Sequence, residues 1–156
     1  SFVASSPQYS LAESHTEPWP MCLSISGAEG SEARKWYAKT QMPLLVWSPL
    51  ASGFFSGRFQ RDNLHEFGER EWDEVVVRVY AKEVNFQRLD RATILANERG
   101  VTVADVALAF AMSQPMNMFS VVGPHSAAKF AANVEAANIK LTSQEMDWLD
   151  LKNDNR

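Results

Sequence analysis

Residues 43–58 read PLLVWSPLASGFFSGR and carry the strongest indication of the fold. The first part of this stretch, up to Trp47, is an unbroken apolar run that ends at Ser48-Pro49. A run of this length, closed by a turn dipeptide, is typical of a strand buried on both faces, as in a parallel sheet. The sequence therefore predicts a parallel-sheet strand at 43–47, followed at its carboxyl end by small residues and glycines.

Outside this stretch, two more short apolar segments are expected to be strands, at residues 2–6 and 118–122. Pro7 closes the first segment and Gly123-Pro124 closes the second. The apolar spacing of three to four residues predicts helices in most of the remaining chain. Helices are expected at residues 32–40, 72–80, 86–99, 103–112, 127–136 and 143–149.

Capping residues support these helix boundaries. Gly100 is expected to end the helix at 86–99. Trp36 and Tyr37 are expected to face inward from the helix at 32–40. N-caps are expected at Ser31, Thr102, Ser126 and Thr142, the last in a capping box with Glu145.

The alternation of strands and helices predicts the α/β class. Residues 51–71 form a long aromatic and glycine-containing segment that the pattern leaves as a loop. A loop of this length within a compact domain usually has a function. Three parallel strands do not make a closed barrel, so the sheet is expected to be incomplete.

Composition excludes several classes of function. The 156 residues are 46% hydrophobic with a net charge of −4, which fits one globular domain and argues against nucleic-acid binding. One cysteine and three scattered histidines give neither a disulfide nor a metal site. No apolar run approaches the roughly 18 residues of a membrane span. No signal peptide is visible, and a cytoplasmic location is expected.

Trp47 stands at the carboxyl end of its predicted strand, where α/β barrels carry their ligand sites. A flat aromatic ring there can stack on a heterocycle. The hydroxyls and amides of the small residues that follow can bind phosphate oxygens. An ordinary buried strand with a proline-glycine loop explains the same residues about equally well.

Residues 121–133, VVGPHSAAKFAAN, hold the second candidate motif. Lys129 and Asn133 lie four residues apart, on one face of a predicted helix. Free amides at a helix N-terminus together with a cation form an anion site. Taken alone, Lys129 is more simply a solvated surface lysine. Its place after the first motif, in the right order, favours the ligand interpretation.

Together these motifs resemble the aldo-keto reductase family. Residues 47–58 are similar to its pattern of an aromatic residue, Ser-Pro-Leu, small residues and Gly-x-x-x-Gly followed by Lys or Arg. Residues 121–133 resemble its final strand and helix, with Ala132 where the family often has Glu. Residues 5–11, SSPQYSL, are similar to its Asn-Gln-x-x-Tyr-Ser-Leu segment, with Ser6 in the Gln position. The resemblance is weakest over residues 12–42 and 59–82.

The resemblance implies that residues 1–156 form the C-terminal part of a (β/α)8 TIM barrel, without a second domain. It implies an NADPH cofactor and reduction of a small carbonyl substrate. Trp47 would stack on the nicotinamide, and Lys129 would meet the 2′-phosphate. The remaining expected contacts are Ser6 at the nicotinamide amide, Ser48, Leu50 and Ser52 along the pyrophosphate, Gly123, His125 and Ser126 around the helix start, and Asn133 at adenine.

The family's catalytic Asp, Tyr, Lys and His lie on earlier strands, and no residue of this chain matches them. The chain is therefore expected to be inactive alone, with no catalytic residue among Tyr9, Tyr37, Tyr80, His15 and His65. It opens at Ser1 without an initiating Met, which leaves a natural short protein, a truncation and a proteolytic fragment open as alternatives. Open sheet edges predict a homo-oligomer or association with the missing N-terminal part. The alternative is a non-enzymatic nucleotide-binding or interaction module derived from a partial barrel.

Overall fold

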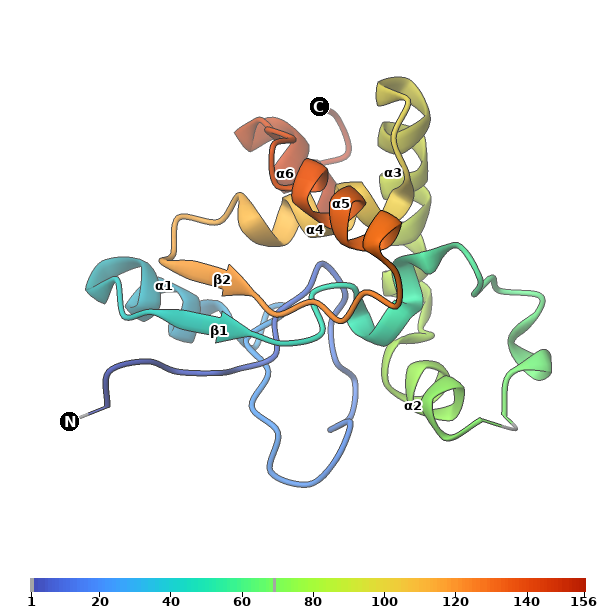
Figure 1. Ribbon diagram of the computed structural model, residues 1–156, viewed down its shortest axis with the longest axis horizontal. Coiled ribbons are helices and arrows are strands. Elements are labelled where there is room, and N and C mark those ends of the chain that lie inside the picture. Colours follow the sequence, from blue (N-terminus) through green and yellow to red (C-terminus); the bar gives the residue numbers. More distant parts are fainter. Residues whose placement is uncertain (1, 69) are drawn as a thin grey trace.

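The computed structural model describes residues 2–68 and 70–156. Helices and short strands mix in a fold with a small parallel sheet, and most of the helices lie to one side of the two strands (Figure 1). In chain order the elements are α1 (Ser31–Thr40), β1 (Leu44–Val46), the 3₁₀ helices η1 (Ala51–Ser56) and η2 (Leu64–Glu66), α2 (Glu71–Tyr80), α3 (Glu83–Arg99), α4 (Val103–Met112), β2 (Met118–Ser120), α5 (Ala127–Ala136) and α6 (Ser143–Leu149).

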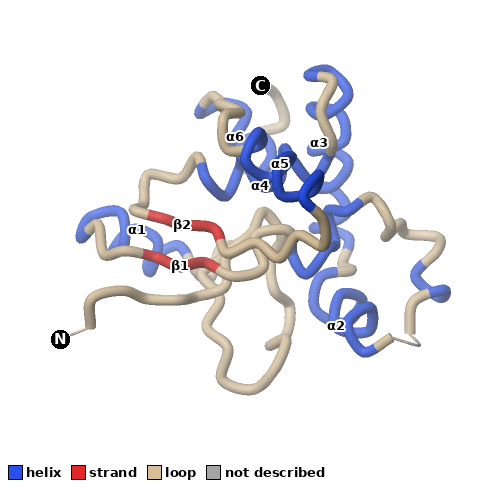
Figure 2. The backbone as a smooth tube through the Cα atoms, in the orientation of Figure 1, coloured by secondary structure: helices blue, strands red, loops and turns tan. Residues whose placement is uncertain are grey.

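The sheet pairs β1 with β2 in parallel, with Leu45 opposite Phe119 at the centre of the register. Two of the predicted strands are confirmed in shortened form. The strand predicted at residues 2–6 is wrong: this segment makes a single parallel bridge, between Ser5 and Leu44, and otherwise runs as coil beside β1 (Figure 2). Phe2 is almost fully exposed, because no neighbouring strand covers the beginning of the segment.

The predicted helices are all present, and three of the four expected caps are confirmed. Thr102 and Thr142 each form a capping box, and the Ser126 hydroxyl accepts the Lys129 N–H. The cap expected at Ser31 is wrong, because Ser31 is already the first residue of α1 and Gly30 is the N-cap. A Cβ at Gly30 would lie 2.1 Å from the Ile25 carbonyl oxygen, so the close approach of the backbone requires glycine.

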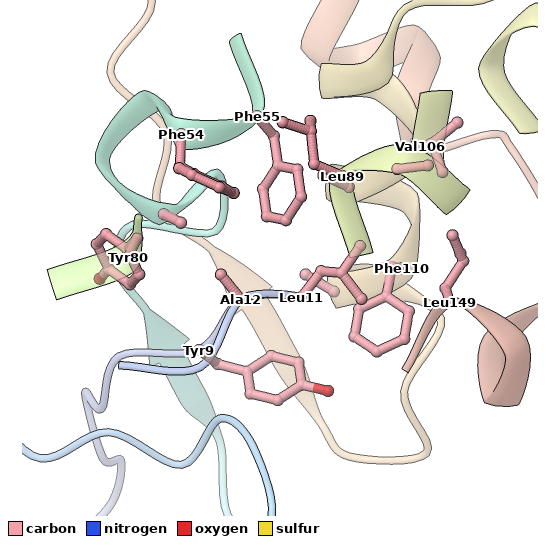
Figure 3. Packing of buried hydrophobic residues seen from close by; sticks show 14 of the residues in the cluster. Tyr9, Leu11, Ala12, Phe54, Phe55, Tyr80, Leu89, Val106, Phe110 and Leu149 are labelled. Carbon is pink, nitrogen blue, oxygen red and sulfur yellow. The ribbon is translucent and has the colours of Figure 1, made fainter. Parts of the chain in front are cut away.

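Burial alternates along β1 and places the core on one side of the sheet. Leu44 and Val46 are fully buried, whereas Leu45 between them is half exposed. The segment expected to be a long loop contributes to this core instead, because Phe54 and Phe55 of η1 are fully buried with their rings packed edge to face. In Figure 3 the Phe55 ring lies beside Leu89 of α3, and Phe54 lies on its other side, toward Tyr80.

The other side of the sheet is open. Leu45, Phe119 and Val121 are all half exposed. Leu45 lies between two buried residues of β1, and Phe119 lies between two half-buried residues of β2. On α1, Tyr37 is buried as expected, but the inward orientation expected of Trp36 is wrong: the indole is 49% exposed and packs edge-on against Tyr37.

Candidate cofactor-binding site

The two sequence motifs lie at the same edge of the sheet. The backbone N–H of Val121 donates to the carbonyl oxygen of Val46 at 2.8 Å, directly beyond the paired residues of β1 and β2. Because β1 and β2 are parallel, their carboxyl ends lie at the same edge of the sheet, where α/β proteins bind ligands. The segments that start at Trp47 and at Gly123 therefore begin next to each other.

The turn after β1 is unusual in its backbone. Ser48, Ala51 and Ser52 have φ values of 50°, 51° and 53°, in the left-handed region that side chains disfavour. The Ala51 N–H donates to the Ser48 carbonyl at 2.9 Å, and the hydroxyls of Ser48 and Ser52 lie 3.3 Å apart. Strain of this kind concentrates at ligand sites, where the surrounding structure holds it in place. Leu50 is half-buried just before η1.

Ser6 lies beside this edge. Its side chain is exposed, and its hydroxyl donates to the carbonyl oxygen of Leu45 at 2.7 Å. The oxygen of that hydroxyl keeps free lone pairs, so it can still accept a hydrogen bond. The serine side chain is thus held close to β1, within reach of the same edge as Trp47.

The start of α5 combines the features of an anion site. Ser126 caps the helix, and the first turn carries Lys129 and no acidic residue. Gly123, His125, Ser126 and Lys129 are exposed, and Asn133, one turn after Lys129, is half-buried. The partial positive charge of the helix N-terminus and the lysine ammonium both attract an anion.

Trp47 has an aromatic partner that sequence reasoning missed. The indole of Trp19 stacks on it, with ring centroids 5.0 Å apart and planes inclined by 23°. Trp19 in turn meets Trp72 of α2 edge-on at 6.2 Å. A tryptophan between Pro18 and Pro20 in a polar loop was a signal of an exposed, functional position. Nothing in the sequence indicated that its partner would be Trp47.

The tyrosines occupy packing positions. Tyr80 is fully buried, and its hydroxyl lies near Ser14 and Ser52 without a hydrogen-bond partner in the described part of the chain. Burial raises the pKa of the Tyr80 hydroxyl, which keeps the group neutral. Burial likewise raises the pKa of Tyr9, whose ring stacks on Phe110. The Tyr37 hydroxyl pairs with Ser5 at 2.8 Å.

Two hollows lie away from this edge. One, of about 240 Å³, is lined by Tyr9, Arg34 and the residues at the end of α4. The other, of about 440 Å³, lies between the start of α4 and the end of α5. Neither is lined by a residue predicted for the cofactor. Among the described residues, no helix is long and apolar enough to cross a membrane, and no cluster of three or more His, Cys, Asp or Glu side chains could hold a metal ion.

Sequence comparison agrees with the fold class. Residues 2–154 match the family model described as "Aldo/keto reductase family", and the chain belongs to that family. This confirms the resemblance found in the sequence. The family relationship places the chain among oxidoreductase-like proteins, a class that generally uses nicotinamide cofactors and carbonyl substrates.

The individual relatives are distant. The chain is 27% identical to versiconal hemiacetal acetate reductase of Aspergillus parasiticus, over 81% of this chain and 36% of the relative. It is 27% identical to putative aryl-alcohol dehydrogenase AAD14 of Saccharomyces cerevisiae, over 70% and 29%. It is 24% identical to a probable voltage-gated potassium channel subunit beta of Oryza sativa, over 77% and 38%. The chain spans about a third of the length of these relatives.

Proposed function

We propose that this chain is the NADPH-binding part of an aldo-keto reductase that reduces a small carbonyl substrate by hydride transfer. Residues 1–156 would form the C-terminal strands and helices of a (β/α)8 barrel, with no second domain. The catalytic Asp, Tyr, Lys and His would come from the part of the barrel that precedes them. The chain's own task is to bind and orient the cofactor.

One observation carries this proposal. The hydrogen bond from Val121 to Val46 puts the turn at residues 47–52 and the segment that leads into α5 at one sheet edge. The first segment offers a flat ring and hydroxyls, and the second offers a helix N-terminus with a lysine. These are the groups that an aromatic ring, a pyrophosphate and a further phosphate require.

The donor set fits NADPH, which when bound supplies the hydride. Trp47 would orient the nicotinamide ring, and Ser6 would hold its amide. Ser48, Leu50 and Ser52 would line the path of the pyrophosphate. At the other end, Lys129 would bind the 2′-phosphate and Asn133 the adenine, with Gly123, His125 and Ser126 around the helix start.

Titration of the purified chain with NADPH, followed by nicotinamide fluorescence and by thermal shift, tests the proposal. We expect saturable binding and a raised melting temperature, because a ligand that binds only the folded state stabilises it. Replacing Ser126 with Ala and Lys129 with Glu together should weaken this binding. If neither signal changes on addition of NADPH, the chain does not bind the cofactor.

A second candidate is a non-enzymatic interaction module that keeps the nucleotide site. It is favoured by the open sheet face of Leu45 and Phe119, and by the relative whose name is that of a channel subunit. NADPH binding without turnover, even after the preceding part of the barrel is restored, would support the module. Association with that preceding part or with a second copy belongs to the proposal, and a cytoplasmic location stays a prediction.

A further inference from the structure

We propose that Trp19 is a displaceable cover on Trp47 and thereby determines how tightly a nicotinamide ring binds. The inference rests on the proposed function, because it concerns the same site. It adds a residue from outside the sequence motifs. In the structure as described, the stacking partner of Trp47 belongs to the protein itself.

The geometry leaves no room for a ligand between the two indoles. Aromatic carbon atoms in contact lie about 3.5–4.0 Å apart, so a third ring would need about twice that separation of the planes. The centroids of Trp19 and Trp47 are only 5.0 Å apart, in nearly parallel planes. A flat ring reaches this face of Trp47 only after Trp19 has moved away.

The stem of the loop that carries Trp19, residues 12–24, is firmly anchored. Arg78 of α2 donates to the Thr16 hydroxyl and to the carbonyl oxygens of Glu17 and Pro18, at 3.0–3.2 Å. At the far end of the loop, the Gln8 N–H donates to the Leu23 carbonyl at 2.8 Å. The base of the loop therefore keeps its place while its tip changes.

The tip makes hydrogen bonds only within the loop, from the Met21 N–H to the Glu17 carboxylate and from the Cys22 N–H to the Trp19 carbonyl, among the described residues. Met21 is 95% exposed, and Trp19 keeps 43% of its surface in solvent. The loop projects away from the sheet (Figure 1), so solvent is available for an indole that rotates outward. Besides Trp47, the ring contact of Trp19 is the edge-on one with Trp72. When Trp19 is displaced, its stacking on Trp47 is replaced by stacking of the nicotinamide ring on Trp47. This movement disturbs no buried hydrogen bond of the stem.

The expected effect follows from the strength of such a pair. An aromatic pair contributes a factor of about 2 to 10 to an equilibrium constant beyond the area it buries. Removing the Trp19 ring should therefore tighten the binding of ligands that contain nicotinamide by about 2- to 10-fold. Ligands that use only the α5 end of the site should bind unchanged.

The experiment compares NADP⁺ with adenosine 2′,5′-bisphosphate, which lacks the nicotinamide half. Both are titrated calorimetrically into the wild-type chain, Trp19→Ala and Trp36→Ala. Trp36 is the matched control, because it is an indole of similar exposure that packs on Tyr37 of α1. We expect Trp19→Ala to lower the Kd of NADP⁺ alone, and Trp36→Ala to change neither Kd.

Circular dichroism gives a readout that does not depend on affinity. Two stacked indoles couple their excited states and give a signal of paired opposite bands. This signal should be lost in Trp19→Phe, diminished in Trp47→Phe, where the edge-on pair of Trp19 and Trp72 remains, and kept in Trp36→Phe. In the wild type, NADP⁺ should diminish it, and adenosine 2′,5′-bisphosphate should leave it unchanged.

The outcomes separate the two proposals. If adenosine 2′,5′-bisphosphate binds but Trp19→Ala leaves the affinity for NADP⁺ unchanged or weakens it, Trp19 is no cover and only this inference is overturned. This inference alone is also overturned if NADP⁺ binds and the coupled indole signal stays unchanged. If neither ligand binds the wild type or Trp19→Ala, the proposed function is wrong, and this inference falls with it.

Discussion

The side-chain amide of Asn85 forms hydrogen bonds with both the backbone N–H and the backbone carbonyl of Glu13. Its oxygen accepts the Glu13 N–H at 2.9 Å, and its nitrogen donates to the Glu13 carbonyl at 2.9 Å. The same nitrogen donates to the Tyr80 carbonyl at 2.9 Å. Asn85 is fully buried, so it joins the beginning of the tryptophan-bearing loop to α2 and α3 away from water.

Replacing Asn85 with Ala should therefore lower the free energy of unfolding by about 2–4 kcal/mol. The substitution leaves backbone groups of Glu13 and Tyr80 without partners, and each buried unpaired group costs about 1–3 kcal/mol. Urea unfolding followed by circular dichroism measures the loss. Asn97→Ala, at an exposed position of the same helix, is the control and should stay within about 0.5 kcal/mol of wild type. An equal loss in both variants would contradict the role of Asn85.

The helices were predictable because their signals are local. Thr102 and Asp105, or Thr142 and Glu145, lie within one turn, so the capping residues can be recognised from the sequence alone. The strand expected at 2–6 failed because a strand needs a partner along its whole length. Only Ser5 finds one, through hydrogen bonds to Pro43 and Leu45. The Gly30 cap depends on the close approach of Ile25, which no local pattern reveals.

The candidate site likewise has one part that the local sequence predicts and another that depends on contacts between distant residues. The motifs after β1 and β2 could be recognised because each is a continuous segment, and their positions on a strand end and a helix start follow from the local pattern. The stacking of Trp19 on Trp47 could not be predicted. It depends on Arg78 and Asn85, which fold a loop from an earlier part of the chain onto this edge.

A pH-dependent contribution to stability is expected from Glu145. Burial opposes the charge of its carboxylate, but hydrogen bonds from the Thr142 backbone and from Arg99 outweigh that effect and lower the pKa below its ordinary value. The stabilisation is therefore fully present above the pKa of the unfolded state, about 4.3, and is lost as the pH falls through the lower pKa of the folded state.

Replacing Glu145 with Gln should cost about 1 kcal/mol of unfolding free energy at neutral pH, with the difference from wild type narrowing in acid. Urea unfolding across this range of pH measures both quantities. Glu32→Gln is the control, because the Glu32 carboxylate is mostly exposed and pairs with the exposed Lys35. A difference from wild type that stays constant down to acid pH would exclude a role for the charge of Glu145.

The preference between cofactors should depend on Lys129. Replacing Lys129 with Glu puts a negative charge where the 2′-phosphate would lie, and a charge-assisted contact is worth about 1.5–3 kcal/mol. The ratio of the Kd values for NAD⁺ and NADP⁺ should then fall by about tenfold or more. Lys140→Glu makes the same change of charge at an exposed position after α5. If the two variants change the ratio equally, only the net charge matters and Lys129 is outside the site.

The isolated chain should turn over no aldehyde or ketone with NADPH. Its tyrosines are buried in packing positions, and general acid assistance is typically worth about 10²–10⁴-fold in rate. Absorbance of NADPH, followed with a panel of small aldehydes and ketones, measures the rate. A Tyr80→Phe variant serves as control, because the Tyr80 hydroxyl lies near Ser52 in the turn at residues 47–52. Turnover that survives repeated purification and disappears in Tyr80→Phe would overturn the prediction.

The last prediction concerns the open face of the sheet. Leu45 of β1, Phe119 of β2 and Val121 just after β2 are half exposed, whereas Leu44 and Val46 on either side of Leu45 are fully buried. Exposed apolar area costs roughly 25 cal/mol per Å², so several such side chains forfeit several kcal/mol, against a total stability of ~5–15 kcal/mol for a domain. Unpaired backbone groups along the outer edges of a two-stranded sheet add to the tendency to associate.

We therefore expect the isolated chain to form dimers or larger assemblies through this face at micromolar concentration, as measured by sedimentation equilibrium. Phe119→Glu should shift the equilibrium toward the monomer, because association would then bury a charge against apolar side chains. Phe130→Glu is the matched control, since Phe130 has the same 55% exposure but lies on α5. A wild-type chain that stays monomeric and unfolds cooperatively would show that the open face needs no cover. An equal effect of both variants would place the contact elsewhere than the sheet.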